Sequence, residues 1–71
     1  MNRARRAVYP GTFDPITNGH LDIIRRALAV FDRVTVAVIA DPAKRALLTL
    51  PERMDLIRRA TRGLRGVEAA S

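Results

Sequence analysis

The chain has 71 residues and a formal net charge of +6, with 13 lysines and arginines against 7 acidic residues. Lys44 is the single lysine, His20 is the single histidine, and cysteine is absent. The lack of cysteine excludes a disulfide framework, a thiolate zinc site and a thiol nucleophile. One histidine among scattered carboxylates also argues against a dedicated transition-metal site.

The length limits how stable such a chain is by itself. Its hydrophobic share of 48% is typical of folded globular proteins. A domain of about 60 residues buries only about 60% of its unfolded surface, so this chain must pack very well, associate, or be part of something larger. Pro10 and Gly11 interrupt the first apolar stretch, which does not fit a signal peptide. The longest apolar run, residues 34–40, is far shorter than the about 20 residues that cross a bilayer. We therefore expect a reducing compartment and no membrane partner.

The first half of the chain predicts a strand, a loop and a helix. Residues 5–9 predict a short strand, because they include β-prone apolar residues, and Pro10 and Gly11 are expected to end this strand. Residues 11–18 predict a loop. From residue 19 onward, apolar residues recur at three- and four-residue spacing, which predicts a helix ending near residues 31–32. The apolar residues in that pattern are Leu21, Ile24, Leu28 and Phe31.

The second half predicts another strand and another helix. Residues 34–40 are nearly continuously apolar and rich in β-branched residues, which favours a strand buried on both faces of a parallel sheet. A polar loop with Lys44 and Arg45 follows. The T-x-x-E spacing of residues 49–52, with proline in the first turn, predicts a capped helix from about 50 to 62. A third strand is expected at residues 67–70. The expected core side chains of the second helix are Leu50, Met54 and Ile57, with Thr61 or Leu64 as further candidates.

The alternation of strands and helices places the chain in the α/β class. It predicts right-handed βαβ units and a Rossmann-like parallel sheet. Two helices cover one face of such a sheet, whereas parallel sheets normally have both faces covered. We therefore interpret residues 1–71 as the first part of one domain whose second half is absent.

Residues 9–20, Y-P-G-T-F-D-P-I-T-N-G-H, are the segment with chemical information. They follow the first strand at the edge where open α/β sheets bind ligands. Gly11 lets the backbone approach a ligand closely, and Gly19 lies at a helix start, where free N–H groups favour phosphate. His20 can direct its imidazole at a phosphate oxygen, and Thr12 adds a hydroxyl. The segment matches neither a Walker loop nor G-x-G-x-x-G.

The same segment resembles the [HT]-x-G-H motif of the nucleotidyltransferase superfamily. Within that superfamily it is most similar to the phosphopantetheine adenylyltransferase family, because Thr17 stands where related nicotinate-nucleotide and glycerol-phosphate enzymes usually have histidine. The similarity continues through residues 22–24, 31–32, 34–40, 42–44 and 49–53, and so covers nearly the whole chain. It implies that residues 1–71 are the N-terminal part of a single nucleotidyltransferase domain.

The resemblance implies reversible transfer of AMP from ATP to 4′-phosphopantetheine, giving dephospho-coenzyme A and pyrophosphate in coenzyme A biosynthesis. Thr12 would bind the acceptor's phosphate and approach the ATP phosphates, and the Phe13 N–H would contact ATP. His20 would hydrogen-bond the α-phosphate as charge builds, and Lys44 would contact the pantetheine phosphate. The family uses Mg²⁺, which ATP phosphates and water can hold without a carboxylate cluster. A cytoplasmic homo-oligomer, typically a hexamer, is also implied.

The chain departs from the family pattern in two places. A second signature of the type I-S-S-S-x-x-[RK] has no counterpart here. Residues 62–65 read R-G-L-R, but they lie at the end of the second predicted helix, whereas the family's segment follows the third strand. We therefore transfer no role to residues 62–65, and we expect the 71-residue chain alone to be inactive.

Simpler interpretations exist for several residues. Asp14 is expected to stabilise the loop or the helix entry rather than bind metal, and Asp22 is expected on a helix surface. The excess of arginine suggests nucleic acid, but no recognition motif or aromatic stacking pattern accompanies it, and we expect no such partner. Two alternatives stay open: a non-catalytic nucleotide- or polyanion-binding fragment, and an adenylyltransferase with an acceptor such as nicotinate mononucleotide. Thr17 argues against the second.

Overall fold

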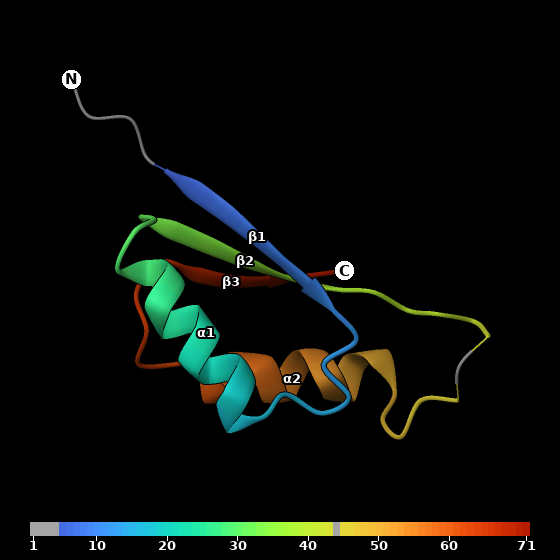
Figure 1. Ribbon diagram of the computed structural model, residues 1–71. Coiled ribbons are helices and arrows are strands. Elements are labelled where there is room, and N and C mark those ends of the chain that lie inside the picture. The colour runs from blue at the N-terminus through green and yellow to red at the C-terminus, as the bar shows by residue number, and fades with distance from the viewer. Residues whose placement is uncertain (1–4, 44) are drawn as a thin grey trace.

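Three parallel strands alternate with two helices along the chain (Figure 1). The structure is a computed structural model that describes residues 5–43 and 45–71. This order confirms the predicted α/β class with a Rossmann-like βαβ arrangement. The elements are β1 (Arg6–Gly11), α1 (Asn18–Leu28), β2 (Arg33–Val38), α2 (Leu50–Ala60) and β3 (Val67–Ala70).

The sheet has the order β1-β2-β3, so β2 is the central strand. In the register of the sheet, Thr35 of β2 lies between Val8 of β1 and Glu68 of β3. Both helices lie on the same side of the sheet (Figure 1), because each crossover moves one strand further in the same direction with the same hand. Across the described residues, none of the helices has the length and apolarity to traverse a bilayer.

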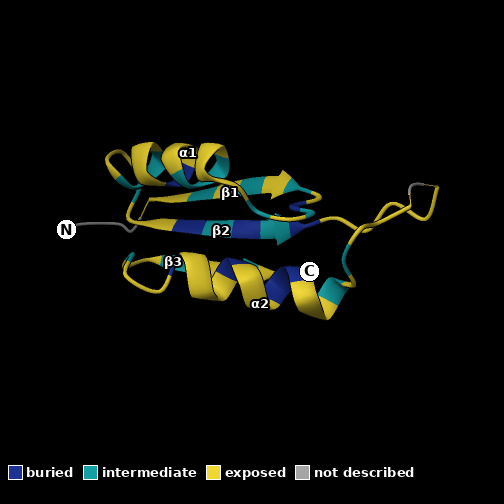
Figure 2. Cartoon of the chain, turned by 90° about the horizontal axis from the view of Figure 1, so that it is seen from below, coloured by how far each residue is buried: buried dark blue, intermediate teal, exposed yellow. Residues whose placement is uncertain are grey.

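The hydrophobic core lies between β2 and the inner faces of the two helices, where Figure 2 shows the buried positions. Along β2 the burial alternates: Val34, Val36 and Val38 are buried, whereas Thr35 and Ala37 are half-buried. In this structure β2 is thus fully buried on one face only, because both helices pack there, and not on both faces as predicted. The buried core cluster consists of Phe13, Ile24, Val36, Val38, Met54 and Ile57.

β1 extends two residues further than predicted and includes Pro10 and Gly11. The Ile39 N–H donates to the Gly11 carbonyl at 2.8 Å, so Gly11 faces β2. Because successive residues of a strand point in alternate directions, Pro10 turns its nitrogen away from β2. Proline is tolerated at such a position because β1 is at the edge of this sheet and no donor is needed there.

α1 ends at Leu28, three to four residues earlier than predicted. The N–H groups of Val30 and Phe31 both donate to the Ala27 carbonyl, at 3.0 and 2.7 Å, in a tight turn. Asp32 then accepts from the Arg5 N–H at 2.8 Å and directs the chain into β2. The apolar spacing continues beyond the helix because Phe31 remains half-buried after the turn.

α2 agrees with the prediction more closely. The predicted capping box is present: the Thr49 hydroxyl accepts from the Glu52 N–H, and Glu52 accepts from the Thr49 N–H. The helix buries Met54 and Ile57, with Leu50 half-buried against the core. Thr61, which follows the helix, is buried, and its hydroxyl donates to the Ile57 carbonyl at 2.7 Å.

Candidate functional site

The turn formed by Thr12 and Phe13 leaves β1 at the carboxyl edge of the sheet. Phe13 has a φ of +47°, which costs a residue other than glycine about 1–3 kcal/mol. The Phe13 side chain is 1% exposed and meets the Tyr9 ring edge-on at 5.1 Å. A Cβ on Gly11 would come within 3.0 Å of the Phe13 ring. Glycine at position 11 therefore makes room for the buried ring that anchors the turn.

His20 is fixed at the start of α1 by Thr17, the N-cap residue. The Thr17 N–H donates to His20 Nδ1 at 2.9 Å, and the Thr17 hydroxyl accepts from the His20 N–H at 3.4 Å. Since Nδ1 is an acceptor in this hydrogen-bond network, the neutral ring is assigned its proton on Nε2. His20 is thereby oriented with Nε2–H as its free donor.

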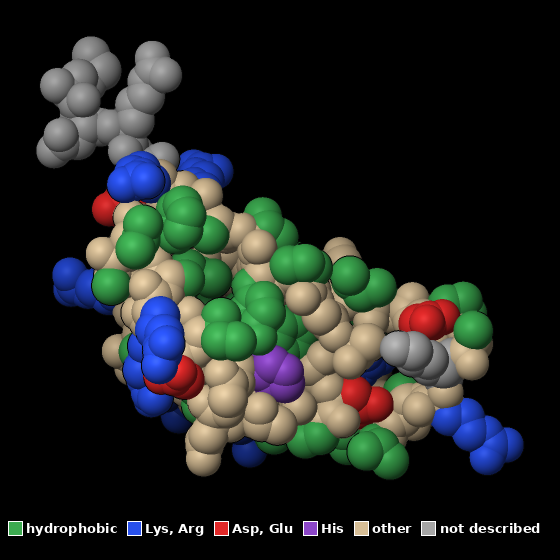
Figure 3. Space-filling model, in the orientation of Figure 1, with side chains coloured by type: hydrophobic (Ala, Val, Ile, Leu, Met, Phe, Trp, Pro, Cys, Tyr) green, Lys and Arg blue, Asp and Glu red, His purple; other side chains and the backbone are tan. Residues whose placement is uncertain are grey.

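An anion can approach this end of α1. The first turn of the helix contains no acidic residue, so its N–H groups and dipole are not compensated from within the helix. The His20 ring lies 4.9 Å from the Phe13 ring and 6.2 Å from the Tyr9 ring, centre to centre. In Figure 3 the single histidine, in purple, reaches the surface beside hydrophobic side chains. The histidine and the turn are thus one packed unit.

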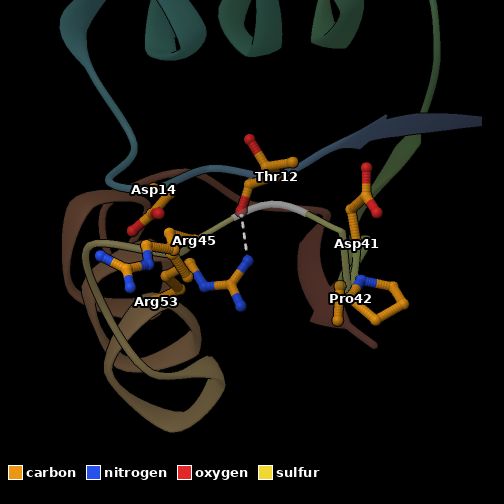
Figure 4. A pocket seen from close by; sticks show the side chains of 8 residues that line it. Thr12, Asp14, Asp41, Pro42, Arg45 and Arg53 are labelled. Atoms are coloured by element: carbon orange, nitrogen blue, oxygen red, sulfur yellow. Dashed lines mark hydrogen bonds between the residues drawn. The ribbon is translucent and has the colours of Figure 1, made fainter.

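A cavity of about 200 Å³ opens on the other side of the turn (Figure 4). Two arginines line it: Arg45 is exposed, whereas Arg53 of α2 is only 5% exposed. Arg53 Nη1 donates to the Thr12 carbonyl at 3.0 Å, and Figure 4 shows its guanidinium directed toward the turn. The other lining residues are Thr12, Asp14, Ala40, Asp41, Pro42 and Ala46.

Asp14 joins the turn to the loop that follows β2. Its two carboxylate oxygens accept from the N–H groups of Leu47 and Leu48, at 2.6 and 2.8 Å. This agrees with the interpretation of Asp14 as a residue that stabilises the loop. Lys44 belongs to the same loop but lies outside the described residues, so its contact with substrate stays a prediction.

The structure brings three of the predicted site residues to one edge of the sheet. Thr12 lines the cavity, Phe13 anchors the turn, and His20 packs on the Phe13 ring. Asp22 lies away from them on the surface of α1, where it pairs with Arg26 at 3.1 Å.

Sequence reasoning missed the role of Arg53. One signal was available in the sequence: Arg53 precedes the core residue Met54 and lies four positions before Ile57, so it falls on the core-facing side of α2.

Comparison with known proteins identifies relatives of this chain. A family profile described as cytidylyltransferase-like matches residues 8–71. The chain is 63% identical over 65 residues to a phosphopantetheine adenylyltransferase of Moorella thermoacetica, which covers 92% of the chain and 41% of that protein. It is 64% identical over 62 residues to a protein of the same name from Thioalkalivibrio sulfidiphilus, covering 87% of the chain and 39% of that protein. The chain spans about two fifths of the length of these curated relatives.

Proposed function

Because the chain belongs to the cytidylyltransferase-like family, we propose that it is part of an adenylyltransferase that transfers AMP from ATP to 4′-phosphopantetheine. The products are dephospho-coenzyme A and pyrophosphate, a step of coenzyme A biosynthesis. The observation that carries this proposal is the Thr12–Phe13 turn packed against His20 at an uncompensated helix N-terminus. The names of the two relatives support the choice of substrates.

The reaction requires little covalent chemistry from the protein. An oxygen of the 4′-phosphate forms a bond to the α-phosphorus of ATP. The bond from that phosphorus to the bridging oxygen breaks, and its electron pair leaves with pyrophosphate. The attacking phosphate oxygen is already ionised, so no general base is needed. Positioning and electrostatic stabilisation therefore account for the catalysis.

We propose a role for each of the four site residues. The Thr12 hydroxyl binds the acceptor's phosphate beside the ATP phosphates, and the Phe13 N–H donates to ATP. His20 donates from Nε2 to the α-phosphate oxygen on which negative charge builds, since its Nδ1 is already bonded to the Thr17 N–H. Lys44 contacts the pantetheine phosphate and completes the set.

Mg²⁺ enters this proposal with ATP rather than on a protein site. The described part of the chain holds no group of three or more side chains that could ligate a metal ion. The two carboxylates at the cavity already accept backbone N–H bonds, Asp14 from Leu47 and Leu48 and Asp41 from Ala43. These donors do not form a cage for a resident metal, and no step is assigned to one. When bound with ATP, Mg²⁺ neutralises phosphate charge.

The proposal extends to the assembled protein. We propose that the 71-residue chain alone is inactive, because the second signature of the resembled family, I-S-S-S-x-x-[RK], has no counterpart in it. A cytoplasmic homo-oligomer is the form proposed for the complete enzyme.

The test uses a completed protein, in which this chain is joined to the part of the Moorella thermoacetica relative that it does not match. Pyrophosphate release is measured with ATP and 4′-phosphopantetheine, with nicotinate mononucleotide as the competing acceptor. We expect release with 4′-phosphopantetheine and a fall in kcat of about a hundredfold or more in His20→Ala. Asp22→Asn, on the exposed side of the same helix, is the control and keeps its activity.

Three outcomes contradict the proposal. Release with nicotinate mononucleotide instead would identify a different acceptor. ATP binding without any release would favour the non-catalytic nucleotide-binding alternative. A His20→Ala protein with unchanged kcat would remove His20 from the site.

A further inference from the structure

Arg53 is a buried cation that no carboxylate neutralises within the described residues. Its side chain is 5% exposed, whereas arginine is almost never fully buried unless it is paired. The ion pairs of the described residues, Asp22 with Arg26 and Asp55 with Arg59, both lie on the surface. Arg53 Nε is buried with no partner among those residues. The bond that Arg53 makes goes instead to the Thr12 carbonyl, 41 positions earlier in the chain.

That bond fixes more than the carbonyl oxygen. The Thr12 C=O and the Phe13 N–H belong to one planar peptide unit, and the cis peptide bond of the described chain is elsewhere, at Asp14–Pro15. In a trans unit the C=O and N–H point in opposite directions. A donor on the carbonyl side therefore directs the Phe13 N–H away from Arg53. No hydrogen bond takes up this N–H within residues 5–43 and 45–71.

The peptide unit also has a competing orientation. Rotating the Thr12–Phe13 unit by half a turn would carry Phe13 from its φ of +47° to a negative φ, which residues with a Cβ prefer. The observed orientation is thus the strained one, and the Arg53 bond opposes its relaxation. In the rotated unit the Phe13 N–H would point toward Arg53, and so away from the side of the turn on which the phosphates are proposed to bind.

We propose that Arg53 is a positioning residue, which holds the Thr12–Phe13 peptide in the orientation that directs the Phe13 N–H toward the phosphates of ATP. This inference rests on the proposed function for the identity of the ligand. Arg53 acts through the peptide and touches neither reactant. Its contribution is largest when charge builds on the α-phosphate, since a preoriented donor needs no reorganisation at that moment.

The test compares three variants of the completed protein. Arg53→Met keeps the unbranched length and apolar packing but removes every donor, and Arg53→Lys keeps one charged donor. Arg58→Met changes an exposed arginine of the same helix. We expect Arg53→Met to lower kcat by about ten- to hundredfold, with the KM for ATP changed less than about threefold, because ground-state contacts are weaker than those in the transition state. Arg53→Lys recovers part of the loss, and Arg58→Met stays within about twofold of the parent.

A second readout separates positioning from simple stability. The Phe13 amide signal in ¹H–¹⁵N spectra is expected to move in Arg53→Met and to stay in place in Arg58→Met. The inference is overturned if kcat of Arg53→Met equals that of Arg58→Met, or if the Phe13 amide signal does not move. It is also overturned if Arg53→Lys, with an unchanged Phe13 signal, loses as much activity as Arg53→Met. If the parent protein releases no pyrophosphate, the proposed function fails, and the Phe13 signal still decides whether Arg53 orients the peptide.

Discussion

Both helices begin with a threonine capping box, but the residue that completes the box differs between them. Each has a threonine N-cap that exchanges hydrogen bonds with the residue three positions later. In α1 that residue is His20, whose Nδ1 accepts from the Thr17 N–H at 2.9 Å. In α2 it is Glu52, whose carboxylate accepts from the Thr49 N–H at 3.0 Å. The backbone at the two helix starts is therefore held in the same way, while the charge placed there differs.

The different charge at the two helix starts suits two different roles, stabilising the fold in α2 and binding an anion in α1. Hydrogen bonds from the Thr49 backbone and side chain hold the pKa of Glu52 below its ordinary value, so α2 carries its own negative charge at the positive end of its dipole. α1 has no acidic residue in its first turn and leaves that place to an anion from outside. His20 keeps the cap intact without supplying the charge. The start of α2 thus stabilises the fold, and under the proposed function the start of α1 receives the phosphate.

The largest effect is expected when α1 is made to resemble α2. His20→Glu restores the usual capping box, so we expect stability within about 1 kcal/mol of the parent. A carboxylate at the phosphate site repels ATP and removes the Nε2–H donor, and kcat/KM for pyrophosphate release should fall by about a thousandfold. Steady-state kinetics of the completed protein, together with thermal unfolding, measure both quantities.

His20→Gln is the matched control for that change. Glutamine keeps the capping-box acceptor without a negative charge, so its activity should lie between those of the parent and of His20→Glu. Equal activity in the Glu and Gln variants would mean that the charge at this helix start does not matter.

A smaller effect on both stability and activity is expected for Thr17→Ala. The variant loses the hydroxyl that accepts from the His20 N–H, which costs about 1 kcal/mol for an N-cap. It also loosens the imidazole, because the Thr17 hydroxyl lies 3.0 Å from His20 Nδ1. We expect kcat to fall about tenfold. A Thr17→Ser variant, which keeps the hydroxyl, should recover both quantities, and its failure to do so would contradict the assigned contacts.

The equivalent change in α2 should affect stability alone. Thr49→Ala removes the acceptor for the Glu52 N–H and is expected to cost about 1 kcal/mol. In the completed protein, of which this chain is about two fifths, that lowers the unfolding midpoint by about 2–4 °C. We expect kcat to stay within about twofold of the parent. A loss of activity as large as that of Thr17→Ala would show that the two helix starts are not functionally distinct.

The two caps also show which parts of the fold are predictable from local sequence. The T-x-x-E spacing of Thr49 and Glu52 is a local signal and correctly predicted the start of α2. The cap of α1 was missed because histidine is not a usual residue at that position. β1 continued through Pro10 because the nitrogen of Pro10 faces away from β2, a property of the strand pairing that residues 5–11 alone do not contain.

The candidate site also contains a part that local sequence predicts and a part that depends on long-range contacts. Thr12, Phe13 and His20 belong to one short motif, so their proximity at the edge of the sheet followed from the sequence. The contacts that hold the motif do not. Arg53 reaches Thr12 across 41 positions, and Asp14 reaches Leu47 and Leu48 across 33 and 34. Such pairings depend on how α2 and the loop after β2 pack on the sheet, which no local pattern specifies.

The smallest effect concerns the charge of Glu52. A carboxyl whose pKa is lowered by folding contributes stability that is present above its unfolded value, here 4.5, and that is lost as the pH falls through the folded value. Glu52→Gln keeps the capping acceptor and removes the charge. Its unfolding midpoint should therefore lie below that of the parent at pH 7, and the difference should vanish in acid below the lowered pKa. Asp55→Asn controls for the loss of one charge on the same helix. A difference between Glu52→Gln and the parent that stays constant from pH 7 to acid would mean that the cap, and not its charge, stabilises α2.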